Sequence, residues 1–192
     1  MAMKVIGING SARKDGNTAI LIRTAFKELE NEGIQTELIQ LAGKKVNGCI
    51  ACCKCFESKN KRCVVKDDVN DCIAKMEDAD GIILGSPTYF ADCSGQMKCF
   101  IDRVGFVSRA NGDMFQRRVG AAVVAVRRGG AIHAFDTINH FFTIGQMITV
   151  GSSYWNVGIG REIGGVEKDE EGMATMTNLG KNMAWLLKKL NQ

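Results

Sequence analysis

The sequence lacks the features that mark several classes of protein. It has one proline and two histidines among 192 residues, and no apolar run reaches the ~18–20 residues that a membrane-spanning helix needs. The N-terminal segment does not have the architecture of a secretory signal peptide. Basic residues outnumber acidic ones by only 25 to 21 and form no long run, which argues against a nucleic-acid partner. We therefore expect a cytoplasmic protein with no nucleic-acid or membrane partner.

The rest of the composition is that of a folded protein. Hydrophobic residues make up 45% of the chain and charged residues 24%, and the length suits a single domain over residues 1–192. The 22 glycines, set against so little proline, indicate tight turns and close backbone approaches rather than linkers. The eight cysteines, without a secretory signal, favour thiols or metal ligands over a disulfide framework.

Strand-like and helix-like segments alternate along the chain. Short apolar segments predict strands at 4–9, 35–41, 81–85, 118–126 and 147–150. Apolar residues at helical spacing predict five helices, at about 18–32, 67–76, 97–104, 131–143 and 169–190. This alternation favours an α/β fold: a doubly wound, five-stranded parallel sheet of order 2-1-3-4-5 with helices on both faces. Residues 151–165 are expected to form a glycine-rich, aromatic-bearing excursion.

Ligands of such folds lie beyond the carboxyl ends of the strands, which places the loop at 10–18 first among the candidates. It joins a strand to a helix N-terminus, where free N–H groups and the helix dipole favour an anion. Ser11, Asn17 and Thr18 add neutral donors, and Arg13 adds charge. The spacing matches neither a dinucleotide fingerprint nor a P-loop, so a terminal monophosphate is favoured. The alternative is an ordinary turn with Asn17 or Thr18 as the N-cap.

Two further loops reach the same edge. The segment Ser86–Phe90 is stiffened by the only proline, and its aromatic residues suit contacts to a flat ring. Its alternative is a proline turn whose aromatic residues pack on the next helix. The turn Arg127–Gly130 offers cations and bare backbone, although two arginines are also usual in a solvated turn.

The spacing Cys49-x2-Cys52-x2-Cys55-x7-Cys63 lies within a cysteine-rich insertion at about 43–66. Three thiolates within seven residues can surround one face of a [4Fe–4S] cubane, and a fourth can close it. Zinc sites more often use two separated Cys-x2-Cys pairs, and free or redox-active thiols remain an alternative. Cys53 adjoins Cys52, so the ligand set is not unique.

The remaining cysteines and the histidines are interpreted as structural. Cys72 falls on an apolar helical stripe, and Cys93 and Cys99 are expected to be packed thiols. His133 and His140 lie seven residues apart on one predicted helix, and without a further ligand nearby a structural role is favoured over metal binding. The sequence shows no acid–base pair or nucleophile triad.

The segments GSARKDGNT and GSPTYF resemble the NADPH-dependent FMN reductase family of the flavodoxin-like fold, and the cysteine segment resembles the iron–sulfur flavoproteins within it. The resemblance implies FMN, with its phosphate held by Ser11, Arg13, Asn17 and Thr18. It places the isoalloxazine beside Pro87, Thr88, Tyr89 and Phe90, and the turn containing Arg127 and Gly129 along the other edge of the ring. It also implies a [4Fe–4S] cluster close to the flavin, held by Cys49, Cys52, Cys55 and Cys63. The chain departs from the family where Arg127-Arg128 replaces small polar residues.

The expected function is electron transfer between FMN, the cluster and a small electron carrier such as ferredoxin, or a small-molecule acceptor. Cations around the cluster are expected to raise its potential and to dock an acidic carrier, although a solvated loop explains them equally: Lys44, Lys45, Lys54, Lys59, Lys61 and Arg62. One alternative is an NAD(P)H-dependent FMN or quinone reductase without a cluster, and another is a zinc- or thiol-based binding module. The family resemblance also implies a homodimer or homotetramer with the flavin near a subunit boundary.

Overall fold

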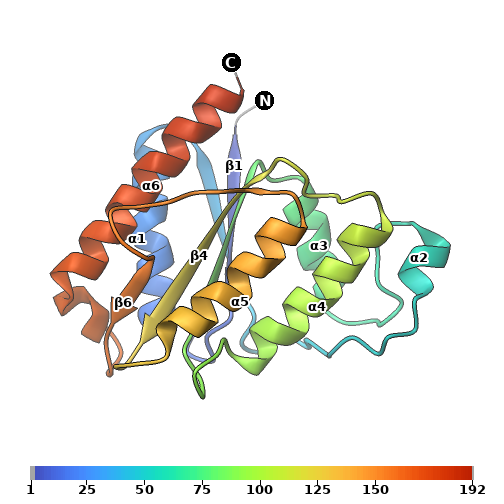
Figure 1. The fold of residues 1–192 in the computed structure, drawn as a ribbon, viewed down its shortest axis with the longest axis horizontal. Helices are drawn as coiled ribbons and strands as arrows, with labels where there is room; N and C mark the ends of the chain where they lie inside the picture. Colours follow the sequence, from blue (N-terminus) through green and yellow to red (C-terminus); the bar gives the residue numbers. More distant parts are fainter. Residues whose placement is uncertain (1–2, 192) are drawn as a thin grey trace.

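The protein is described here by a computed structural model that covers residues 3–191. Figure 1 shows its elements, which are β1 (Lys4–Asn9), α1 (Asn17–Asn31), β2 (Gln35–Gln40), α2 (Lys54–Ser58), α3 (Val69–Glu77), β3 (Gly81–Pro87), α4 (Gly95–Ala110), β4 (Val119–Val126), α5 (Ala131–Ile144), β5 (Ile148–Thr149), β6 (Val157–Ile159), η1 (Gly165–Lys168) and α6 (Glu170–Leu190). The main path of the sheet is β2-β1-β3-β4-β5, with every pair parallel. This confirms the predicted fold and strand order.

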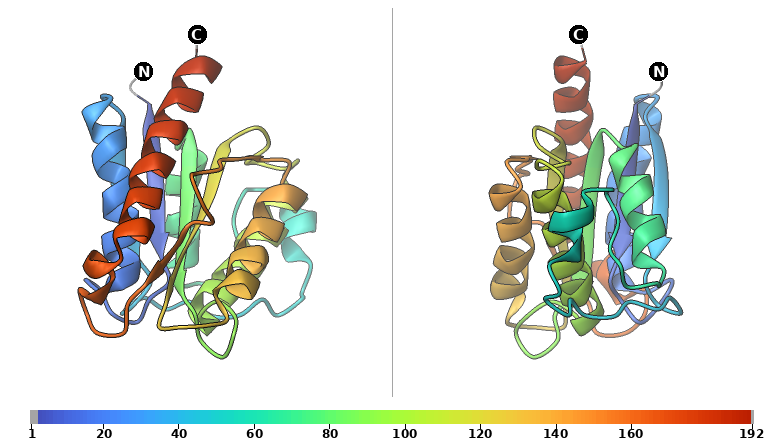
Figure 2. Two further views of the ribbon diagram at one scale, coloured as in Figure 1. Left: turned by 60° about the vertical axis from the view of Figure 1, so that its left-hand side comes forward. Right: turned by 90° about the vertical axis from the view of Figure 1, so that its right-hand side faces the viewer.

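Two apolar layers cover the sheet, and Figure 2 shows the helices on its two sides. Ile82 and Leu84 of β3 face the layer formed with α3, α4 and α5, whereas Ile83 between them faces α1 and α6. This alternation follows from the period of two residues in a strand. Because both faces are covered, the central strands are apolar almost throughout, as the sequence indicated.

A short strand occupies part of the segment that was expected to form an excursion. The two residues of β5 pair only with the start of β4, and β6 pairs with Val124–Val126 at its end. The fifth position of the sheet is therefore shared by two short strands. Three residues with a glycine at their centre carry too little periodicity to predict β6 from the sequence. Its pairing brings the following loop, residues 160–162, to the N-terminus of α1.

The cysteine segment connects β2 to α3. Its five-residue helix α2 packs against α4, as Figure 1 shows, and is too short to be predicted from helical periodicity. Within residues 3–191, no helix is both long and apolar enough to cross a membrane.

Candidate flavin site and cysteine centre

The loops after β1, β3 and β4 meet at the carboxyl edge of the sheet, as predicted. They enclose a cavity of about 180 Å³ together with the loop after β6. It is lined by Ser11, Arg13, Asn17, Thr18, Pro87, Thr88, Tyr89, Ala125, Val126, Arg127, Gly160 and Arg161. Every predicted flavin residue except Phe90 and Gly129 is in this set, and the set contains no carboxylate.

One end of the cavity is suited to a phosphate. The N-cap of α1 is Gly16, and no side chain caps this helix end, so its first N–H groups are open to a ligand. This differs from the alternative in which Asn17 or Thr18 caps the helix. The Thr18 hydroxyl is buried and has no hydrogen-bond partner among the described residues. The exposed side chains of Arg13, Arg127 and Arg161 surround the opening, so a dianionic group there meets donors and positive charge.

Asn17 lines the cavity, but its side chain is engaged elsewhere. Its amide nitrogen donates to the carbonyl oxygens of Gly160 and Glu162, both at 2.9 Å. Since both amide hydrogens are used, the predicted donation from this side chain to a phosphate is not available in this arrangement. The amide instead fixes the loop that carries Arg161, a cavity residue that the sequence analysis missed. Only the pairing of β6 with β4 reveals this loop.

The opposite end of the cavity suits a flat ring. The Thr88 hydroxyl is buried and lacks a hydrogen-bond partner within residues 3–191, while the Thr88 N–H donates to Ala125 O at 2.9 Å. Tyr89 N donates to Asp92 O at 2.8 Å, closing a tight turn in which Phe90 has φ of 47° and Ala91 has φ of 64°. Phe90 is fully exposed at the tip of this turn.

The predicted contacts of Phe90 and Gly129 with the ring are not formed by the cavity as it stands. Neither residue lines it, because the turn directs Phe90 into solvent and Gly129 lies in the exposed turn after β4. The remaining set still fits FMN. Two buried hydroxyls without partners, an uncapped helix N-terminus and three arginines can bind an anion at one end and polar ring atoms at the other.

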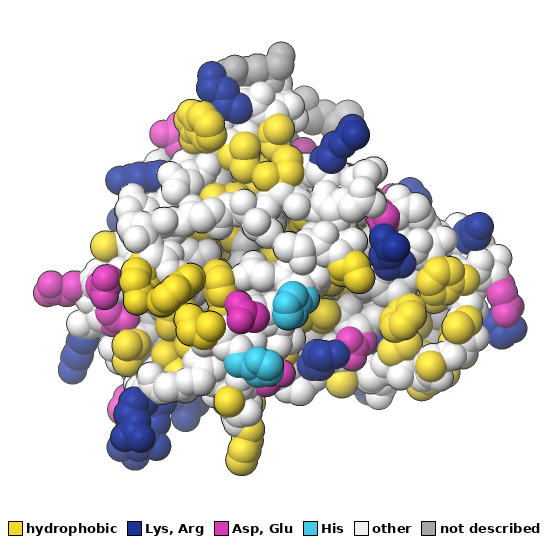
Figure 3. Space-filling model, viewed as in Figure 1, with side chains coloured by type: hydrophobic (Ala, Val, Ile, Leu, Met, Phe, Trp, Pro, Cys, Tyr) yellow, Lys and Arg dark blue, Asp and Glu magenta, His cyan; other side chains and the backbone are white. Residues whose placement is uncertain are grey.

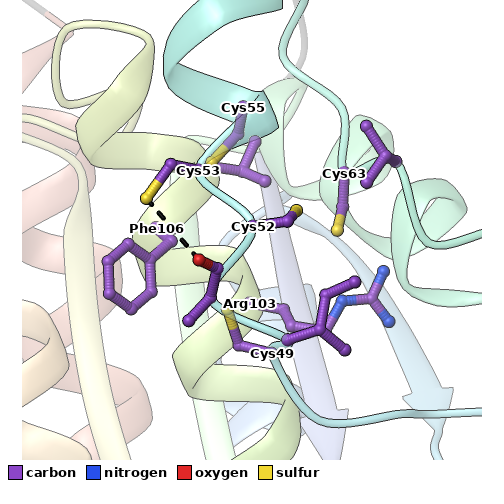
Figure 4. Close-up of a pocket in the computed structure, with 11 residues that line it drawn as sticks. Cys49, Cys52, Cys53, Cys55, Cys63, Arg103 and Phe106 are labelled. Carbon is purple, nitrogen blue, oxygen red and sulfur yellow. Dashed lines mark hydrogen bonds between the residues drawn. The ribbon is translucent and has the colours of Figure 1, made fainter.

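The predicted cysteine ligands line a second, smaller cavity of about 90 Å³, drawn in Figure 4. Its other walls are largely apolar and include Ile50, Val64, Phe106 and Val107. Figure 3 shows hydrophobic side chains gathered on the surface at this end of the molecule, where Phe56 and Phe106 meet edge to face with ring centroids 6.4 Å apart. The loop thus brings Cys49, Cys52, Cys55 and Cys63 together.

Cys53 also lines this cavity, but its thiol is directed differently. Its Sγ donates to Ala51 O at 3.7 Å, and Figure 4 shows it turned away from the sulfur atoms of Cys52 and Cys63, which face one another. Ala51 and Cys53 both have positive φ, 51° and 55°, which costs about 1–3 kcal/mol per non-glycine residue. Such strain, concentrated in one loop, is typical of a binding site.

The separation of the thiols bears on the kind of metal centre. Among the residues that the structure describes, no three His, Cys, Asp or Glu side chains converge closely enough to hold a single ion. A structural zinc site needs four ligands on one ion, whereas a [4Fe–4S] cubane takes four thiolates at separate irons. The cavity brings the four predicted cluster ligands together without forming a single-ion site among the described residues. Burial raises the pKa of the Cys55 thiol, so binding iron there must displace a proton.

The other cysteines and the histidines lie outside both cavities. Cys72 and Cys93 are buried as predicted, and burial raises the pKa of Cys72 to about 11 and that of Cys93 to about 12. Cys99 is only partly buried. Both histidines are exposed on α5, as Figure 3 shows, and His133 Nε2 lies 3.5 Å from Asp92 Oδ2.

The two cavities share no lining residue. The flavin cavity is formed by the loops at the carboxyl edge of the sheet, and the cysteine cavity is lined by the insertion and by residues of α4. The expectation that the cluster lies close to the flavin stays a prediction.

Comparison with known proteins agrees with this geometry. The model of the family described as NADPH-dependent FMN reductase matches residues 3–162. An iron–sulfur flavoprotein of Methanocaldococcus jannaschii is 42% identical, with 99% of this chain and 100% of that protein covered. An iron–sulfur flavoprotein of Methanosarcina thermophila is 31% identical, with 99% and 98% covered.

Solved structures support the fold. RosB with a bound riboflavin-phosphate intermediate superposes with a TM-score of 0.75 at 18% identity, covering 99% of this chain and 81% of that chain. A flavodoxin from the domain Archaea gives a TM-score of 0.63 at 18% identity, covering 97% and 99%. The chain thus belongs to the NADPH-dependent FMN reductase family, within its iron–sulfur flavoprotein branch.

Proposed function

We propose that this FMN redox protein passes electrons between FMN, a [4Fe–4S] cluster held by Cys49, Cys52, Cys55 and Cys63, and a small carrier or acceptor. The observation that carries the proposal is the gathering of these four cysteines around one cavity with apolar walls. The match to the FMN reductase family and the flavoprotein relatives support the general function, that of an oxidoreductase that uses FMN. The cluster and the direction of electron flow are the proposed part.

FMN exchanges either two electrons or one, a [4Fe–4S] cluster exchanges one, and both chemistries belong to the cofactors. The chain's own residues bind and orient these groups. The first turn of α1, Thr18 and the three arginines would hold the phosphate, and Pro87, Thr88 and Tyr89 would lie beside the ring. Phe90 is available as a contact from the rim if its turn moves toward the cavity.

A small carrier such as ferredoxin would approach the exposed side of the cysteine cavity, where Cys49, Cys52 and Cys53 are accessible. The positive charge there is smaller than the composition suggested. Neighbouring carboxylates pair with three of the cations: Lys44 with Asp68, Lys54 with Glu57 and Lys61 with Glu77. An acidic carrier would therefore be steered only weakly by this surface, and its docking would depend less on salt than that of a strongly basic site.

The test is the cofactor content of protein purified without oxygen. We expect one FMN and about four iron per chain, with an iron–sulfur contribution to the absorbance spectrum. Cys63→Ser should lose most of the iron but keep FMN, whereas Cys53→Ser, the matched control, should keep both. Protein that holds zinc but no flavin would instead be the zinc- or thiol-based binding module, and the proposal would be wrong.

A second candidate is an NAD(P)H-dependent FMN or quinone reductase without a cluster. It is favoured because the residues that line the flavin cavity include no cysteine, so the cavity is formed without the cysteine segment. Steady NAD(P)H oxidation by iron-free protein, at the rate of iron-loaded protein, would support this reading and contradict a working role for the cluster.

We also propose that the chain forms a homodimer or homotetramer. Tyr154 and Trp155 remain about half exposed and meet edge to face with ring centroids 4.7 Å apart, and such exposed aromatic pairs are typical of interfaces. Light scattering should give a multiple of the 20.9 kDa chain mass, and a monomer at micromolar concentration would contradict this.

A further inference from the structure

Arg103 is the largest side chain that the described structure buries completely. It lies on α4 and pairs with Asp67 from the end of the cysteine segment, and neither side chain is exposed. A buried charge is retained only when it is paired and hydrogen-bonded. This ion pair lies against the cysteine cavity, whose wall includes Arg103.

The pair joins the two ends of the cysteine loop. Arg103 donates to Asn47 O at 3.3 Å, just before the first cysteine ligand, and to Val65 O at 3.2 Å, just after the last. Asp67 accepts from the backbone N–H and the side-chain amide of Asn47, each at 3.0 Å. One guanidinium and one carboxylate therefore close the base of the loop.

Asn70 on α3 reinforces this closure from the other side. Its side chain accepts from Cys63 N at 2.7 Å and donates to Cys63 O at 3.0 Å. All of these bonds form within the chain and need no cluster. The position of Cys63 is thus set before any iron binds, which lowers the entropy lost when the cluster is built.

One nitrogen of Arg103 is left over. Its Nε is buried and has no partner in the described part of the chain, and Figure 4 shows the side chain running along the wall formed by Cys49 and Cys63. A buried donor without an acceptor is unfavourable. The sulfur atoms of an anionic cluster are acceptors of the kind that this donor lacks, and a positive charge beside a cluster favours its reduced form.

We propose that Arg103 is a positioning residue for the cysteine centre, which with Asp67 closes the loop before iron binds and whose buried charge raises the potential of the cluster. The second half of this inference rests on the proposed function, because it needs a cluster in the cavity. The first half concerns the protein without metal and stands separately.

The first experiment follows hydrogen exchange of amides 48–66 in metal-free protein. Arg103→Gln should speed their exchange at least about tenfold, because the loop loses its closure. The control is Arg109→Gln on the same helix, where an exposed arginine pairs with Asp113 at 2.8 Å, and it should leave these amides unchanged. Equal exchange in both variants would overturn the closing role.

The second experiment is an anaerobic redox titration of the cluster followed by electron paramagnetic resonance, with one electron taken up per cluster. Wild-type protein that binds no iron would refute the proposed function but leave the exchange experiment as the test of closure. With a cluster present, Arg103→Gln should lower the ratio of reduced to oxidised cluster about tenfold at fixed potential, which is a shift of about 59 mV.

Two further variants separate charge from structure. Asp67→Asn removes the negative partner, so it should shift the potential upward, opposite to Arg103→Gln. Arg103→Lys keeps the charge but loses the forked geometry, so it should speed amide exchange while keeping a near-native cluster potential. If Arg103→Gln does not fold, Asp67→Asn and Arg103→Lys together test the proposal. Shifts of the same sign in Arg103→Gln and Asp67→Asn, or no shift in Asp67→Asn, would overturn the electrostatic role.

Discussion

Gly160 offers the most direct test of the flavin cavity, because the structure leaves no room for a side chain there. A Cβ at this position would lie 2.4 Å from Val166 N, 2.8 Å from Asn17 Nδ2 and 2.8 Å from Gly165 C. Two of these neighbours are backbone atoms, so the loop itself must move. Gly160→Ala should therefore displace the loop that Asn17 holds and carry Arg161 away from the phosphate end of the cavity.

The magnitude follows from two contributions. Overpacking costs about 1–3 kcal/mol, and losing the two hydrogen bonds from Asn17 to this loop adds about 0.5–1.5 kcal/mol each. We expect a loss of ~2–6 kcal/mol in the free energy of unfolding, or roughly 4–24 °C in Tm. Losing one charge-assisted contact to phosphate should weaken FMN binding by about 10- to 100-fold.

Thermal unfolding and fluorescence titration of the apoprotein with FMN measure both effects. The matched control is Gly151→Ala in the same segment, where an added Cβ meets nothing within 4 Å, and it should behave as wild type. If Gly160→Ala also matches the wild type in both Tm and FMN affinity, the loop does not contribute to the cavity as described.

Three further predictions address the site and the sheet edge. Thr18→Val should leave the apoprotein equally or more stable, because it removes a buried hydroxyl without a partner, yet should weaken FMN binding about tenfold; unchanged affinity would remove Thr18 from the phosphate site. Arg161→Gln should weaken the binding of FMN but not of riboflavin, and equal losses in titrations with the two would contradict a phosphate contact. Hydrogen bonds from Lys4 and then Lys75 lower the pKa of Glu37, so its stabilisation is present above the unfolded-state pKa and is lost as the pH falls through the lower folded value. The difference in urea unfolding between wild type and Glu37→Gln should therefore be present at neutral pH and vanish in acid, and a difference that persists there would contradict the assignment.

Local sequence patterns determine several features of this protein. The alternation of short apolar segments with helical stripes predicts the sheet and its strand order. The apolar residues of each strand and helix recur with that element's own period, which identifies its buried face, and five strands alternating with helices favour the order 2-1-3-4-5. The three loops at the carboxyl edge follow from that order. The spacing of the cysteines likewise brings four thiols to one loop, since neighbours in sequence need no distant partner to meet.

Other features depend on contacts between segments that are far apart in the sequence. β6 exists because β5 leaves the end of β4 unpaired, and only that pairing brings Arg161 and Asn17 together. Arg103 does share the apolar stripe of α4 with Phe100 and Val107. The sequence alone is equally consistent with an arginine whose charged group extends from this stripe into solvent. Its partner Asp67 lies 36 residues away, and burial of that pair is decided only when α4 packs against the closed cysteine loop.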